Sequence, residues 1–398
     1  MKLEQLRTNF QRPKNKIIFA IFFITLILGT YGILYLDMVK SPITKSPWVL
    51  WYNDPSNEVI IGWESENNED GIIYYGTSSS FLQFSQPNST IGNFHHILLQ
   101  GLLSNTTYYY LIGSITPTTK NYTDIYSFRT APSDTTTNFS VIVTSDTQQF
   151  GIANGWTNHL AKVVSDQNPS FFMIVGDLTQ EGRTKSNWDD FFQNIQPITK
   201  SIPLVPVIGN HEANLDYTNE VPVWMHTYFP ISKSNTQFFY SFNYSMVHFV
   251  QMDVQWGTQY DLSTEQIDWL KADLARAQSL PFRVVSFHCP IRDSGVFGDN
   301  SLLQTQLKPI LQQYNVSLVL NGHDHHYERV YDDGLNYVVQ GGGGDMQDPF
   351  IVTANETTKI VFGPTYTKIT ATPSELTVQA YTLYGALVDN YVITAGGK

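Results

Sequence analysis

The chain has 398 residues and a formal net charge of −12 at pH 7, and 42% of its residues are hydrophobic. This apolar content is sufficient for sizeable cores and excludes global disorder. Nucleic-acid-binding surfaces are normally basic, and this chain has no basic stretch outside its N-terminus, so we expect no nucleic-acid interface. The length allows two domains besides a targeting segment.

The N-terminus has the pattern of a membrane anchor. Residues 17–36 form an uncharged run of 20 residues, which as a helix would span about 30 Å, the thickness of a bilayer core. Five basic residues and a single acidic one precede this run, and positive flanks stay in the cytoplasm. We therefore predict a cytoplasmic tail over residues 1–16, a transmembrane helix over residues 17–36, and a single-pass membrane protein whose remainder is extracellular or lumenal.

A cleaved signal peptide is the alternative to this anchor. Such a peptide would have a shorter apolar region followed by small residues at a cleavage site, whereas Asp37-Met38-Val39-Lys40 follows here.

Cys289 is the single cysteine, so no intrachain disulfide can form although the domains are expected to face outward. Seven glycosylation sequons are compatible with an exported glycoprotein, at Asn88, Asn105, Asn121, Asn138, Asn243, Asn315 and Asn355.

Two regions with different patterns of predicted secondary structure follow a short polar linker over residues 37–47. From residue 48 to 132, short apolar runs such as Val59–Trp63, Gly71–Gly76 and His96–Leu99 alternate with turns. Several short strands at this spacing predict an all-β sandwich of about 85 residues. The segment Gly101–Tyr108 resembles the turn-and-tyrosine segment of fibronectin type III domains, so we predict a fibronectin type III-like domain.

Strands and helices alternate in the second region, residues 138–396. We expect helices over residues 155–166, around Trp188 to Ile195, and from a capping-box pattern at Ser263. Alternation of this kind predicts an α/β domain with layered sheets flanked by helices. The apolar runs that read as strands are Phe139–Thr144, Phe171–Val175, Leu204–Ile208, Arg283–Phe287 and Val316–Leu320, with terminal strands between Tyr366 and Ile393.

A polar residue follows each of the five central strands. Ligands bind at the carboxyl edge of the strands in α/β sheets, so five such residues indicate a shared site, although any one alone is more simply a turn residue. Imidazole with carboxylate and amide oxygens suits iron, manganese or zinc. The residues are Asp146, Asp177, Asn210 with His211, His288, and His323 with His325.

These motifs resemble those of the calcineurin-like metallophosphoesterases and, within that superfamily, of the purple acid phosphatases. The matching pieces are Gly176-Asp177, Gly209–Glu212, His288 after a strand, and Gly322–His325 continued by His326–Arg329. The predicted N-terminal sandwich and the closing strands fit the same family. The resemblance covers residues 48 to about 393.

The resemblance implies a dinuclear metal site holding two ions of iron, manganese or zinc. Asp177 would bridge the ions. Asn210, His288 and His323 would complete one site, and Asp146 and His325 would belong to the other. His211 would contact the phosphate or protonate the leaving group. The implied activity is the hydrolysis of phosphate monoesters, on small molecules or surfaces, by a hydroxide that the metals activate.

Two departures from the family pattern concern the metal ligands. Gln180 occupies the position of the tyrosine ligand of purple acid phosphatases, and Gln148 stands where other metallophosphoesterases have a histidine ligand. Gln148 is therefore a further candidate ligand through its amide oxygen, the alternative being that it binds a metal-bound water. A second group of substrate histidines is missing after His288. The metal core does not by itself choose between monoesters and diesters, so a phosphodiesterase on the same scaffold is one alternative function. An inactive surface-binding or adhesion protein is the other.

Overall fold

The computed structural model describes residues 43, 45–115, 120–148, 155–213, 222–344 and 356–396. The predicted cytoplasmic tail and membrane anchor, residues 1–36, lie outside this range, as does most of the linker over residues 37–47. No helix of the described residues is long and apolar enough to cross a membrane.

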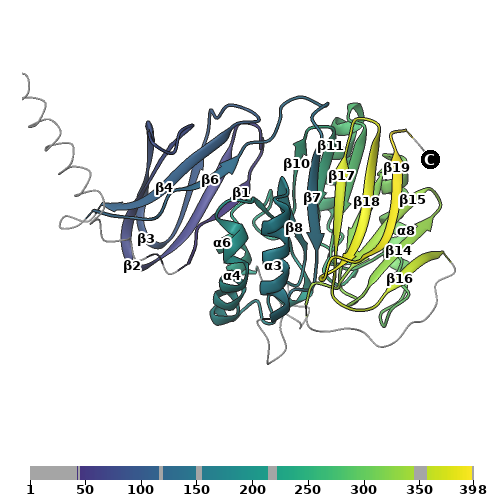
Figure 1. Ribbon diagram of the computed structural model, residues 1–398. Helices are drawn as coiled ribbons and strands as arrows, with labels where there is room; N and C mark the ends of the chain where they lie inside the picture. The colour runs from purple at the N-terminus through teal and green to yellow at the C-terminus, as the bar shows by residue number, and fades with distance from the viewer. Residues whose placement is uncertain are drawn as a thin grey trace, which may run out of the picture.

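The N-terminal domain is a β-sandwich, as predicted (Figure 1). Two of its strands are much longer than expected. Val59–Trp63 and Gly71–Gly76 are not separate strands but the ends of β2, and β3 extends far beyond His96–Leu99. The two strands pair antiparallel, with register shifts around Glu69. Backbone pairing needs no apolar side chain, so the polar middle of each strand carries no hydrophobic signal. The strands are β2 Val59–Gly76, β3 Phe84–Leu99, β4 Thr107–Ile115, β5 Lys120–Tyr122 and β6 Tyr126–Arg129.

Two sheets form the layers of the second domain, and both contain parallel strands. In the first sheet, β7 Phe139–Thr144, β8 Phe171–Val175 and β9 Leu204–Val207 are parallel. The predicted terminal strands continue this sheet beyond β7 as β17 Thr365–Ala371, β18 Glu375–Thr382 and β19 Leu387–Thr394. The second sheet has the order β10-β11-β12-β13-β15-β14-β16. Its strands are β10 Tyr240–Tyr244, β11 Val247–Gln251, β12 Phe282–Ser286, β13 Leu318–Asn321, β14 Tyr327–Asp332, β15 Leu335–Gln340 and β16 Thr357–Val361.

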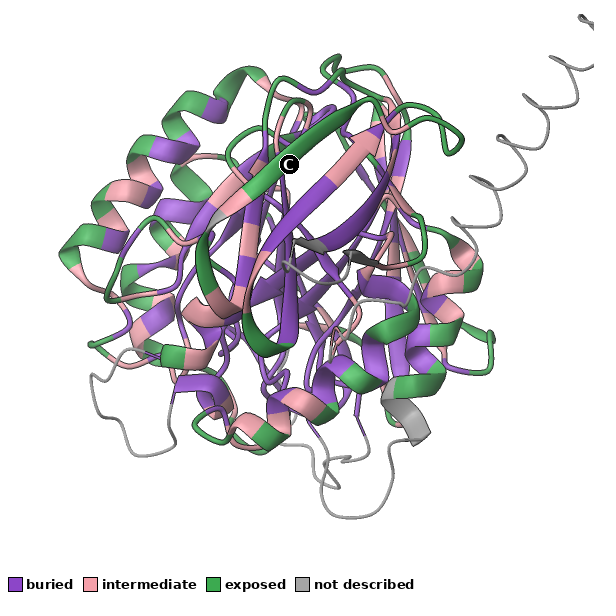
Figure 2. Cartoon of the chain, turned by 90° about the vertical axis from the view of Figure 1, so that its left-hand side faces the viewer, coloured by how far each residue is buried: buried purple, intermediate pink, exposed green. Residues whose placement is uncertain are grey.

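Helices cover the outer faces of the two sheets, which confirms the predicted layered α/β domain. Figure 2 shows buried residues in the interior strands and exposed residues on the outward faces of the helices. Trp188 of α4 packs into the larger core, and Leu270 of α7 packs into a second core against the other sheet. The helices are α3 Gly155–Gln167, α4 Lys185–Thr199, α5 Asn210–Ala213, α6 Val223–Tyr228, α7 Thr264–Arg276, the 3-10 turn Ala277–Ser279, α8 Ser301–Gln306 and α9 Lys308–Gln313.

Strand β1, Trp48–Trp51, connects the two domains. It pairs antiparallel with β2 and also parallel with β9, through Leu50 and Leu204. The first sheet therefore runs from the second domain into the sandwich without interruption. Trp48 packs against Tyr228 of α6, with ring centroids 5.6 Å apart, and its indole N–H donates to the Tyr228 carbonyl at 3.0 Å.

Candidate metal centre

The five predicted polar residues lie at the carboxyl ends of strands from both sheets. β7, β8 and β9 are parallel in one sheet, and β12 and β13 are parallel in the other. Because the two sheets are stacked, the loops after these strands meet at one edge of the molecule. The residues there, Asp146, Asp177, Asn210, His288 and His323, are all buried. Burying so many polar groups together is costly unless they bind something.

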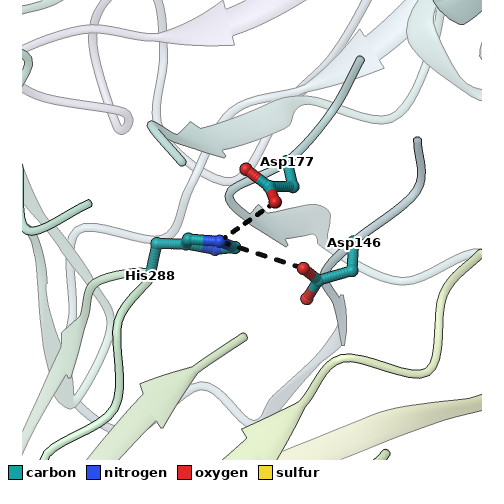
Figure 3. Close-up of side chains that lie close together, drawn as sticks. All are labelled: Asp146, Asp177 and His288. Atoms are coloured by element: carbon teal, nitrogen blue, oxygen red, sulfur yellow. Dashed lines mark ion pairs between the residues drawn. The ribbon is translucent and has the colours of Figure 1, made fainter. Parts of the chain in front are cut away.

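Asp146, Asp177 and His288 form the centre of this group (Figure 3). The Nε2 atom of His288 lies 3.2 Å from Asp177 Oδ2 and 3.9 Å from Asp146 Oδ1. The other ring nitrogen, Nδ1, donates to the Val175 carbonyl at 2.9 Å, which directs Nε2 toward the carboxylates. Such an outer hydrogen bond orients a metal-binding imidazole.

The carboxylates of Asp146 and Asp177 favour a positive charge at this centre. Burial alone would lower the pKa of His288, but the facing Asp177 and Asp146 raise it to about 10. Burial would also raise the pKa of Asp177, yet His288 and His211 hold it well below its usual range. The same two carboxylates would favour a metal cation beside His288, whose imidazole must be neutral to bind one.

The remaining predicted ligands surround this centre on two sides. His323 Nδ1 lies 2.9 Å from Asn210 Oδ1, and its ring meets that of His288 edge-on at 5.2 Å. Burial lowers the pKa of His323 to about 3, so its imidazole is neutral, the form that binds metals. His325 Nε2 lies 3.5 Å from Asp146 Oδ1. The structure thereby brings together all six residues that the resemblance assigned to the two metals.

Gln148 lies among these donors. It is buried, and its amide nitrogen is 3.3 Å from Asp177 Oδ2 and 3.4 Å from His325 Nε2. Its amide oxygen has no hydrogen-bond partner within the described residues. A half-turn of the amide would exchange the two atoms and direct the oxygen at the metal position, so both expected roles of Gln148 fit.

His211, on the short helix α5, is placed differently from His288. Its Nδ1 donates to the Gln180 carbonyl at 2.7 Å, and its Nε2 lies 3.7 Å from Asp177 Oδ2. Its side chain is 14% exposed, whereas that of His288 is fully buried. His211 therefore lies beside Asp177 and borders solvent.

Sequence reasoning assigned no role to Glu212, which organises two of the ligand loops. Its carboxylate accepts hydrogen bonds from the backbone N–H of Asp177 at 2.9 Å, Thr179 at 3.0 Å and Gly209 at 2.9 Å. Burial, followed by the charge of Asp177, raises its pKa to about 7. The signal in the sequence is an acidic residue directly after Asn210 and His211, the two polar residues that follow β9.

The comparisons with known proteins agree with this geometry. Residues 139–327 match the calcineurin-like phosphoesterase family, and residues 47–130 match the purple acid phosphatase N-terminal domain. The chain therefore contains a calcineurin-like phosphoesterase domain that follows a purple acid phosphatase N-terminal domain. This family uses a dinuclear metal centre, and the buried carboxylates and imidazoles described above fit one.

Individual relatives of this phosphoesterase come from plants. Purple acid phosphatase 15 of Arabidopsis thaliana is 27% identical over 68% of this chain and 57% of its own length. Purple acid phosphatase 22 of the same plant is 28% identical over 64% of this chain and 60% of its own length. The chain thus spans less than two thirds of the length of these relatives. The structure of purple acid phosphatase PPD1 from yellow lupin has the same fold, with a TM-score of 0.79 and 20% identity over 89% of this chain and 74% of that one.

The position of the tyrosine ligand of purple acid phosphatases holds no tyrosine in this chain. The carbonyl of Gln180, which occupies that position, accepts the hydrogen bond from His211. The hydroxyl of Tyr327 donates to Asp389 of β19 at 2.8 Å instead of facing the ligands. Aromatic rings flank the site: Phe297 stacks on His323 at 4.2 Å, and Trp256 meets the same ring edge-on at 5.4 Å.

Four consecutive glycines, Gly341–Gly344, follow β15 and pack beneath the ligand loops of the phosphoesterase. A Cβ atom at Gly341 would lie 1.9 Å from the Asp324 carbonyl oxygen, and one at Gly343 would lie 2.3 Å from the Ser145 carbonyl oxygen. Both distances are far below any allowed contact, so the loops can approach only because these residues have no side chain. Sequence reasoning missed this run, although four adjacent glycines are a visible signal.

Proposed function

We propose that this protein hydrolyses phosphate monoesters at a dinuclear metal centre. The observation that carries the proposal is the buried cluster of Asp146, Asp177 and His288, whose donor atoms lie within 4.8 Å of one another and beside three further donors. When bound, two metal ions would neutralise charge on the transferring phosphoryl group and supply an activated water. Asn210, His288 and His323 would hold one ion, and Asp146 and His325 the other, with Asp177 between them.

His211 is the residue that we assign to the leaving oxygen. The Gln180 carbonyl accepts from Nδ1, so Nδ1 carries a proton and Nε2 faces the site. Protonated His211 can donate from Nε2 to the departing alkoxide, which is general acid catalysis. Its partial exposure leaves room for the alcohol portion of a substrate.

The side chains at the rim of the site favour a substrate whose alcohol portion has an apolar surface. The side chains of Val296 and Phe297 are 52% and 58% exposed, in the segment after His288 where sequence reasoning found no substrate histidines. Phe297 reaches the ring of His323 and so stands next to the metal position. Apolar and aromatic rims favour contacts with the non-phosphate part of a ligand.

A paired assay tests the proposal against its alternatives. The metal-loaded protein is given 4-nitrophenyl phosphate and bis(4-nitrophenyl) phosphate, and Asp177→Asn is the matched inactive control. We expect turnover of the monoester, slower turnover of the diester, and neither with the variant. Faster cleavage of the diester would support the phosphodiesterase alternative. A metal-loaded protein that cleaves neither ester would support a surface-binding role.

We further propose that residues 17–36 anchor the protein in a cell membrane, with the two domains outside. The support is the uncharged length of this segment and the basic residues before it. Protease added to intact cells should remove the domains, and complete protection would refute this orientation. Asn138, Asn243 and Asn315 are exposed, which supports glycosylation at their sequons. Enzymatic deglycosylation should then lower the apparent mass, and an unchanged mass would refute modification.

A further inference from the structure

A second buried cluster lies behind the loop that carries His323 and His325. The alternate residues of this loop, Asp324 and His326, are buried in a group with Asp293 and Glu328. None of these four residues belongs to the dinuclear centre. The loop therefore separates two polar clusters and contributes side chains to both.

The second cluster has the donor spacing of the first. His326 Nε2 lies 3.3 Å from Glu328 Oε2 and 3.6 Å from Asp293 Oδ1, and the three donor atoms lie within 4.8 Å of one another. The corresponding distances from His288 Nε2 in the dinuclear centre are 3.2 Å and 3.9 Å. The side chains of Asp293, His326 and Glu328 are at most 1% exposed.

Asp293 lacks the hydrogen-bond donors that a buried carboxylate needs. Neither of its oxygens accepts a hydrogen bond from the described residues, and the Nδ1 atom of His326 has no partner among them either. Glu328, by contrast, accepts from the Ser294 N–H at 2.8 Å and from the Ser294 hydroxyl at 2.6 Å. Asp293 therefore points into the cluster with its oxygens unsatisfied, which is unfavourable unless a cation or a proton meets them.

The charges around the cluster do not balance. Asp293, Asp324 and Glu328 contribute three carboxylates against the single imidazole of His326, and the side chains of Asp293 and Asp324 contact each other. The neighbouring Arg292 forms its ion pairs with Asp299, Asp332 and Glu356 instead. A compact group of this composition is stabilised by a cation or by a proton that the carboxyl groups share.

Gly295 keeps the cluster free of a further side chain. A Cβ atom there would lie 2.6 Å from Asp324 Cγ and 2.8 Å from His326 Cε1. Any larger residue at this position would push into the space between the donors.

We propose that Asp293, His326 and Glu328, completed by Asp324, bind a third divalent cation that is separate from the dinuclear centre. Three carboxylates with one imidazole and no thiolate suit Mn²⁺ or Zn²⁺. The ion would not touch the substrate. It would hold the loop between β13 and β14 from behind, and so position His323 and His325.

Metal stoichiometry tests this proposal. The full chain is saturated with Mn²⁺, dialysed, and its metal content is measured by plasma mass spectrometry. We expect about three ions per chain, and about two in Asp293→Asn. Asp333→Asn, at an exposed acidic residue, is the matched control and should keep about three. Equal metal contents in the wild type and Asp293→Asn would overturn the proposal, because a proton shared between the carboxyl groups would then suffice.

A variant that lacks the dinuclear centre tests the third-ion site independently of the proposed activity. Asp177→Asn should lose most of the dinuclear metal but keep the third ion, and adding Asp293→Asn should remove that ion. Anomalous diffraction from Mn²⁺-loaded wild-type crystals gives a direct readout that needs no variant. A peak between Asp293, His326 and Glu328 is expected, and density without a peak there would overturn the proposal even if the dinuclear centre is fully occupied.

Discussion

His211 and His288 show how two imidazoles in one site acquire different functions. Each donates from Nδ1 to a backbone carbonyl, so each presents Nε2 to the centre. His288 is completely enclosed and faces two carboxylates, whereas His211 is partly exposed at the edge. The roles proposed for them, metal ligand and proton donor, therefore rest on burial and neighbours rather than on residue type.

Removing His211 should slow the reaction without emptying the metal centre. We expect His211→Ala to lower kcat by roughly 10²–10⁴-fold, the usual contribution of general acid catalysis, while the metal content stays that of the wild type. His159→Ala is the control, because His159 contacts the Leu383 carbonyl, away from the centre, and its kcat should not change. Loss of metal from His211→Ala would contradict the assigned role.

Gln148 should tune the affinity of one metal position. An amide oxygen is an uncharged ligand, so Gln148→His should tighten binding of the weaker ion and Gln148→Ala should loosen it. Competition with a chelator of known affinity measures both effects. Identical metal affinity in the two variants and the wild type would show that Gln148 neither binds the metal nor supports its water.

The ligand loops illustrate what the sequence predicts at the scale of elements. The strand-end positions of the ligands were predictable because apolar runs mark buried parallel strands and polar residues mark their ends. The backbone conformations were not: Asp146, Asp177 and His323 have φ values of 56°, 51° and 76°. These left-handed conformations are maintained by contacts between loops that are distant in sequence, such as those of Glu212, and a local pattern does not record such contacts.

Glu212 should be essential for the stability of these loops. Glu212→Ala leaves the N–H groups of Asp177, Thr179 and Gly209 without their acceptor, and each unsatisfied buried group costs about 1–3 kcal/mol. We expect a loss of unfolding free energy of at least about 2 kcal/mol and weaker metal binding. Denaturant titration measures the first effect. Glu265→Ala, on the exposed first turn of α7, is the control; an equal loss there would contradict a specific role for Glu212.

Asp253, just after β11, should make the stability of the protein depend on pH. Burial raises its pKa from 3.8 to about 7, with the charge of Asp261 adding to the effect. Between these values the folded chain holds a proton that the unfolded chain has lost, so the unfolding free energy falls as pH rises through this window. The change is at most about 4 kcal/mol, at about 1.4 kcal/mol per pKa unit.

The variant Asp253→Asn removes this proton and should flatten the dependence. Urea denaturation at pH 5 and pH 8 measures it, and the difference between the two pH values should be smaller in the variant than in the wild type. Asp268→Asn, on α7, gives a matched control. Parallel pH profiles for the wild type and Asp253→Asn would show that Asp253 ionises normally.

At the scale of the whole molecule, the two domains share one sheet and a polar interface. The sheet crosses from β9 through β1 into β2. The Tyr110 hydroxyl donates to the Lys200 carbonyl at 2.8 Å, and Lys185 Nζ lies 2.8 Å from Glu64 Oε1. The sequence predicted both domains but not this junction, since β1 has only four residues and a single residue pair joins it to β9.

The shared sheet predicts that the two domains unfold together. Calorimetry of the wild type should show one transition. Trp48→Ala removes a buried indole at the junction, should cost about 3–5 kcal/mol, and should separate the transition into two. Phe81→Ala, at a side chain that is 67% exposed, is the control. Two transitions already present in the wild type would contradict this coupling.

The glycine run after β15 has a consequence for how the sequence of this protein can change over generations. Gly341 and Gly343 provide no chemical group, yet any side chain there would collide with the main chain of the loops beside them. A survey of random substitutions should therefore find these positions as intolerant as Asp177 or His288. The proposed site would be lost by crowding as readily as by the removal of one of its polar side chains, so the sequence freedom of this protein is limited by space as well as by chemistry.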